Sequence, residues 1–216
     1  MQQDRTPYRL IAGIAAIAAI AFFIGIFASG LSRKTADVPQ IPGFLWPNPP
    51  LVKEFSLTTQ HGLEFSRDNL LGQWSFMFFG FTQCPDVCPT TMQNLKTTRE
   101  LLADDEIYAE QGQIVFVSVD PDRDTAEIIT SYLNYFDKQF VGITGPEEKL
   151  TELTKPLGIL FAKIDSGDSY TMDHSASILL IDPKGRVLGL FSMPHDPKMI
   201  SQSFKVITKF YAQYPG

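Results

Sequence analysis

The sequence contains few of the residues that carry metal and redox chemistry: it has two cysteines and three histidines among 216 residues. It also lacks any cluster of Lys and Arg, and its formal net charge is -6. Without a basic patch the chain has no electrostatic footprint for nucleic acid, which excludes that class of partner. Two cysteines are too few for a disulfide framework, so stability must come from an ordinary hydrophobic core.

One long hydrophobic run is present, from Leu10 to Leu31, and it contains no charged residue. A helix rises about 1.5 Å per residue, so this run can cross a hydrocarbon core of about 30 Å. We therefore predict a single transmembrane helix over residues 10–31, after a short flank of residues 1–9. A cleaved secretory signal is the alternative, because Ala28–Gly30 is a small-residue stretch, but the apolar core of such signals spans only about 7–15 residues.

The charges that flank this run do not determine its orientation. Arg5 and Arg9 precede it, while Arg33 and Lys34 follow it, so the positive-inside count is nearly balanced. No Arg-rich and Ser-rich presequence comes before the run, which argues against a mitochondrial transit peptide. We expect an anchor in a bacterial inner membrane.

Five prolines fall within residues 32–53, and this composition predicts an extended, semi-rigid linker. The remaining residues, 54–216, form the predicted globular domain. A domain of that length can bury about two-thirds of the surface that its unfolded chain exposes, so it needs no disulfide for stability.

Within the domain, hydrophobic patterns typical of strands alternate with patterns typical of helices. The run from Trp74 to Phe81 is apolar on both faces, as in a strand at the centre of a covered sheet. Strands are expected at 55–59, 63–65, 74–81, 114–119, 140–144, 177–181 and 187–191, and helices after Cys88 and over 124–136, 147–155 and 197–211. This order predicts an α/β thioredoxin-like sandwich with an N-terminal hairpin.

Both cysteines lie directly after the central strand, in Cys84-Pro85-Asp86-Val87-Cys88-Pro89. Ligand sites in open α/β folds form at the carboxyl ends of the strands, and the N-terminus of a helix favours thiolate over thiol. Three residues separate the cysteines, so they lie about one helical turn apart and both sulfur atoms can face one ion. A plain disulfide and two unrelated core thiols are the alternatives.

His174 precedes the predicted strand at 177–181, in the loop that faces the cysteine pair in thioredoxin folds. The alternative is a loop histidine bonded to Asp173 or to backbone. Structural zinc normally takes four protein ligands, whereas two thiolates and one imidazole suit copper. We expect His61 at a hairpin tip and His195 before a helix start, both as solvated or local capping groups.

Three sequence blocks resemble the Sco/SenC family of copper-binding cytochrome c oxidase assembly proteins. They are GFTQCPDVCPTTM at 80–92, VSVDPDRDT at 117–125 and YTMDHSASILLIDPKGRVLG at 170–189. The blocks occur in the order of the family, and together with the N-terminal anchor the resemblance covers essentially the whole chain. It implies a thioredoxin-like domain that faces the periplasm from a single-pass inner-membrane anchor.

The resemblance also implies that Cys84, Cys88 and His174 bind copper, as Cu(I) or Cu(II). The implied partners are subunit II of cytochrome c oxidase and a chaperone that donates the copper. Gln83 and Met172 depart from the residues that are usual in the family, but neither is an implied ligand. The second block places Asp120 and Asp124 near the site or at a partner surface, although a turn explains Asp120 and a helix cap explains Asp124.

Three functions follow from this pattern. The first is a metallochaperone that delivers copper to the dinuclear copper site of the oxidase. The second is a thiol-disulfide reductase that keeps the target's cysteines reduced through a redox-active Cys84 and Cys88 pair. The third is a redox- or peroxide-sensing protein with Cys84 as the reactive thiol, which leaves His174 without a role.

Overall fold

A computed structural model describes residues 14–15, 18–23, 38–45, 47–167 and 169–214 of the chain. The predicted transmembrane segment, 10–31, lies largely outside the described residues, and within them no helix is long and apolar enough to cross a membrane. The chain divides into two units, Met1–Asp37 and Val38–Gly216, and the second carries the elements below.

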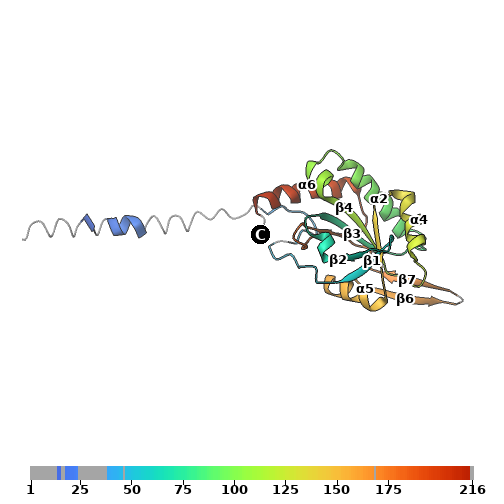
Figure 1. The fold of residues 1–216 in the computed structure, drawn as a ribbon. Coiled ribbons are helices and arrows are strands. Elements are labelled where there is room, and N and C mark those ends of the chain that lie inside the picture. Colours follow the sequence, from blue (N-terminus) through green and yellow to red (C-terminus); the bar gives the residue numbers. More distant parts are fainter. Residues whose placement is uncertain (1–13, 16–17, 24–37, 46, 168, 215–216) are drawn as a thin grey trace, which may run out of the picture. The chain divides into compact units, whose positions relative to one another are not determined.

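A seven-stranded mixed sheet forms the centre of the second unit, with the strand order β2-β1-β5-β4-β3-β8-β9 (Figure 1). Its strands are β1 (Ser56–Thr59), β2 (Glu64–Ser66), β3 (Trp74–Gly80), β4 (Gly112–Ser118), β5 (Val141–Thr144), β8 (Ile178–Ile181) and β9 (Val187–Phe191). β3, β4 and β5 are parallel, whereas β1 with β2 and β8 with β9 form antiparallel hairpins. These pairings confirm the predicted mixed α/β arrangement and its N-terminal hairpin.

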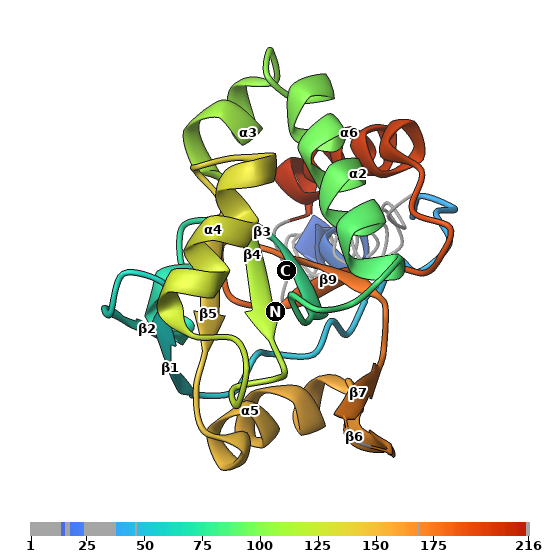
Figure 2. The same ribbon diagram turned by 90° about the vertical axis from the view of Figure 1, so that its right-hand side faces the viewer.

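Helices cover both faces of this sheet (Figure 2). They are α2 (Val87–Leu101), α3 (Glu106–Gln111), α4 (Ala126–Phe136), α5 (Glu147–Thr154) and α6 (Pro197–Gln213), with 3-10 turns η1 (Arg67–Leu70) and η2 (Lys155–Leu157). Phe76 and Phe78 of β3 pack with α2, α4 and α6, while Met77 and Phe79 pack on the face that α5 covers. Because all seven residues of β3 are buried, the end of this strand is a firmly held base for the cysteine loop.

A second, two-stranded sheet was not expected from the sequence. It consists of β6 (Phe161–Ser166) and β7 (Ser169–His174), and it projects beyond the large sheet (Figure 1). The prediction that His174 lies in a loop is therefore wrong: it is the last residue of β7.

The compact unit begins at Val38, earlier than the predicted domain boundary at residue 54. Phe44 bridges to Gly189 and Leu51 bridges to Arg186, and Val52 is fully buried. Part of the proline-rich segment therefore packs along β9.

Candidate metal centre

The cysteine loop joins the end of β3 to the start of α2. Cys84 is half-buried, and its Sγ accepts a hydrogen bond of 3.3 Å from the backbone N–H of Cys88 in the first turn of α2. Cys88 is fully buried and packs so closely on Gly80 that a Cβ there would lie 2.9 Å from the Cys88 Sγ. The absence of a side chain at Gly80 thus leaves room for the second sulfur.

His174 reaches the same place from β7. Its Nε2 lies 3.5 Å from the Cys88 Sγ, and its Nδ1 lies 3.3 Å from the backbone oxygen of Ser175. When Nε2 binds a metal, Nδ1 carries the ring proton and can donate it in a hydrogen bond to that oxygen. The rings of Phe81 and Phe78 contact the imidazole edge to face and hold its plane.

The ligand atoms of Cys84, Cys88 and His174 all lie within 4.8 Å of one another. Bonds from a metal to sulfur or nitrogen are about 2.0–2.3 Å long, so two ligands on opposite sides of one ion lie about 4.6 Å apart at most. The three residues fit one ion after a small movement. Two sulfur donors and one imidazole form a soft donor set, which suits copper better than a hard cation.

The two thiols have different acidities. A hydrogen bond from the thiol of Cys88 lowers the pKa of Cys84 most, against the opposing effect of burial, and His174 and the backbone N–H groups of Asp86 and Cys88 lower it less. The same contact with Cys84, together with burial, raises the pKa of Cys88. The pair therefore holds one thiolate on Cys84 at neutral pH, and a metal must displace the proton of Cys88 to use both sulfurs.

The sequence predicted that Asp124 caps a helix. This prediction is wrong, because the N-cap of α4 is Thr125. Asp124 is buried and accepts hydrogen bonds from the backbone N–H and the hydroxyl of Thr82 and from the Ser118 hydroxyl. Burial raises its pKa, opposed by these hydrogen bonds. Through these hydrogen bonds Asp124 connects the loop that carries Cys84 to the end of β4.

The other two histidines lie outside the cluster. His61 is exposed in the turn between β1 and β2, as predicted. The expectation that His195 is a solvated or local capping group is wrong, because it is 5% exposed and contacts Thr91 at 3.0 Å and the Phe191 oxygen at 3.2 Å, while Asp196 is the N-cap of α6. Thr91 lies 104 positions away in the sequence, so no local pattern indicated this burial.

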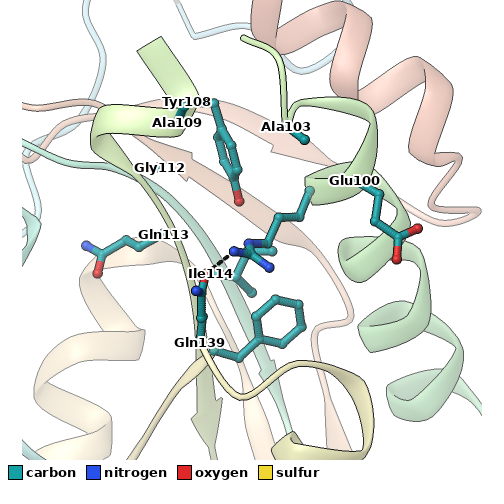
Figure 3. Close-up of a pocket in the computed structure, with 10 residues that line it drawn as sticks. Glu100, Ala103, Tyr108, Ala109, Gly112, Gln113, Ile114 and Gln139 are labelled. Carbon is teal, nitrogen blue, oxygen red and sulfur yellow. Dashed lines mark hydrogen bonds between the residues drawn. The ribbon is translucent and has the colours of Figure 1, made fainter. Parts of the chain in front are cut away.

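The cluster opens into a cavity of about 240 Å³ lined by Phe81, Pro85, Val87 and His174. A separate cavity of about 410 Å³ lies at the other end of β4, beside Gly112 (Figure 3). Tyr108 and Gln139 line it, but the cluster of Cys84, Cys88 and His174 does not. Cys84 and His174 therefore line the first of these two cavities and not the second.

The fold and the cluster define a thioredoxin-like protein with a potential metal site of two thiols and one imidazole. The chain matches the SCO1/SenC family over residues 47–209 and belongs to that family. A putative copper-binding protein of Stutzerimonas stutzeri is 36% identical over 163 residues, which are 74% of this chain and 78% of that protein.

Solved structures show the same fold. The crystal structure of yeast Sco1 superimposes with a TM-score of 0.69 at 30% identity, over 76% of this chain and 100% of that one. Arabidopsis thaliana ScoI with copper bound gives a TM-score of 0.68 at 28% identity, over 76% of this chain and 99% of that one. The fold class predicted from the sequence is thus that of the Sco family.

Proposed function

We propose that this chain is a copper metallochaperone that holds copper on Cys84, Cys88 and His174 and assists the assembly of cytochrome c oxidase. The supporting observation is the convergence of two sulfur atoms and one imidazole nitrogen within 4.8 Å, although His174 lies 86 positions beyond Cys88. Copper-bound relatives with the same fold support the choice of metal.

A cargo site must release its ion as well as bind it. Cys84 is half-buried and His174 is partly exposed, whereas Cys88 is buried, so one side of the site is open to a partner. We propose that the receiving partner is subunit II of the oxidase, with a second chaperone as the copper donor. The site then faces the periplasm from a single-pass anchor at residues 10–31 in a bacterial inner membrane.

The test is Cu(I) affinity of the purified, reduced full-length chain, measured by competition with a chromophoric chelator. His174→Ala removes one ligand, and we expect at least a tenfold loss of affinity, about 1.4 kcal/mol. His61→Ala is the matched control, because it removes an exposed histidine remote from the thiols. Equal affinity of His174→Ala and wild type would contradict the three-ligand site.

A thiol-disulfide reductase is the second candidate, and the lowered pKa of Cys84 favours it, because a thiolate beside a second free thiol can attack a disulfide. In that reaction the Cys84 thiolate forms a mixed disulfide, and the Cys88 thiolate then releases the reduced partner. If His174→Ala still exchanges disulfides but binds copper more weakly, the two thiols carry out the exchange and the imidazole binds the metal.

A peroxide-sensing role gives His174 no function, so the observed contact between His174 and Cys88 disfavours it.

A further inference from the structure

The segment Asp120–Asp124, between β4 and α4, touches both halves of the metal centre without supplying a ligand. Asp124 accepts two hydrogen bonds from Thr82 of the cysteine loop and one from Ser118 of β4. Asp120 and Arg123 of the same segment contact β7, the strand that ends at His174. Five residues thus link the thiol half of the site to the imidazole half.

The contact with β7 is made through Tyr170. Its hydroxyl donates a hydrogen bond of 2.8 Å to the carboxylate of Asp120, and its backbone oxygen accepts one of 2.9 Å from Nη1 of Arg123. Arg123 Nε also donates to Asp120, at 2.5 Å. Because the Asp120 side chain is only 2% exposed, this ion pair is screened far less by solvent than a surface pair.

Two cations lie over the ring of Tyr170. The guanidinium carbon of Arg123 lies 3.7 Å from the ring centre, and Nζ of Lys163 lies 3.8 Å from it. Both distances are within the range of a cation–π interaction. Because Arg123 belongs to the segment Asp120–Asp124 and Lys163 belongs to β6, the ring links this segment to the hairpin.

The geometry of β7 carries this contact to His174. Tyr170, Met172 and His174 alternate with exposed residues along the strand, so all three face the body of the domain. A strand rises about 3.3 Å per residue, which places Tyr170 about 13 Å from His174 along one rigid element. The β6–β7 pair forms a sheet of its own, so side-chain contacts such as those of Tyr170 contribute to its position against the domain.

We propose that Asp120, Arg123 and Tyr170 are positioning residues that set the distance of the His174 imidazole from the two thiols, and thereby the copper affinity. This inference rests on the proposed copper site. It gives a function to the block VSVDPDRDT, which supplies no ligand. Outer-shell partners of metal ligands typically change affinity by about 10–100-fold, and we expect Tyr170→Ala to weaken Cu(I) binding within that range.

A double-mutant cycle on the full-length chain tests the proposal. Cu(I) affinity is measured for wild type, Tyr170→Ala, His174→Ala and the double variant. If Tyr170 acts through His174, Tyr170→Ala weakens binding in the wild-type background and has less than about a twofold effect in the His174→Ala background. Ser169→Ala, an exposed neighbour on β7, is the control and should leave the affinity unchanged.

Two results overturn the proposal: wild-type affinity in Tyr170→Ala, or an equal loss in both backgrounds, which indicates general destabilisation. If His174→Ala itself binds copper like wild type, the three-ligand site fails, and the positioning role fails with it. Tyr170→Phe keeps the contacts of the ring with the two cations but removes the hydrogen bond to Asp120, so it should fold and give a smaller loss. If Tyr170→Ala does not fold, the same cycle is run with Tyr170→Phe. The proposal is then overturned if Tyr170→Phe leaves the Cu(I) affinity unchanged, or if it lowers the affinity equally in the wild-type and His174→Ala backgrounds.

Discussion

The two halves of the metal centre are held in different ways. Cys84 and Cys88 follow β3, whose residues are all buried and which pairs with both β4 and β8. His174 ends a two-stranded sheet whose β7 is half-buried on one face and exposed on the other. The thiols therefore belong to the part of the molecule that packing fixes most firmly, and the imidazole depends on a small number of side-chain contacts.

This difference has a consequence for a metal carrier. A site that is rigid on all sides binds tightly but releases slowly, whereas a ligand on an outlying hairpin can be withdrawn without unfolding the core. In the proposed site, the two sulfurs therefore retain the metal, and His174 with the contacts that position it controls the affinity.

The largest effect is expected in the free energy of unfolding when a side chain of each region is truncated. Phe76→Ala in β3 removes a fully buried ring that contacts Phe204 and Tyr108, and it should cost about 3–5 kcal/mol. Ile164→Ala in β6 removes a side chain that is 46% exposed, and it should change stability by less than about 0.5 kcal/mol. Urea denaturation of both variants measures the difference, and similar losses would remove the distinction between the two regions.

A smaller effect is expected in the acidity of Cys84, to which both regions contribute. The contact with Cys88 lowers the pKa of Cys84 most, and the contact with His174 lowers it less. Cys88→Ala should therefore raise that pKa more than His174→Ala, and alkylation of Cys84 should shift to higher pH in the same order. The rate of reaction with iodoacetamide as a function of pH measures this shift, with His61→Ala as the control.

The rate of Cys84 alkylation rises with pH because the thiolate is the form that reacts. Wild-type Cys84 reacts well below the pH at which an ordinary thiol does, because its thiolate persists there, while Cys88 stays protonated and buried. Faster alkylation of Cys88 than of Cys84, or an unchanged profile in Cys88→Ala, would contradict the assignment of the thiolate to Cys84.

Much of the thiol half was predictable from the sequence. A run that is apolar on both faces, such as Trp74–Phe81, has few alternatives to a central strand, and the residues that follow such a strand lie at its carboxyl end. The start of the next helix also lies close to its predicted position: a helix was expected after Cys88, and α2 begins at Val87, one residue before it.

The imidazole half was predictable in identity but not in placement. The family resemblance pointed to His174, yet β6 and β7 contain many polar residues, so their hydrophobic pattern was too weak to indicate strands. This hairpin contacts residues about 40 to 50 positions earlier, from the Tyr170 hydroxyl to Asp120 and from the Lys163 ammonium to Asp122. Short-range patterns do not report such contacts, which also explains the incorrect expectations for Asp124 and His195.

The measurement that tests the central claim most directly is X-ray absorption at the copper edge of the Cu(I)-loaded full-length chain. We predict two sulfur donors and one nitrogen donor in the wild type, and two sulfur donors without the histidine nitrogen in His174→Ala. A wild-type spectrum with sulfur donors alone, or a nitrogen donor that persists in His174→Ala, would contradict a site built from both regions of the molecule.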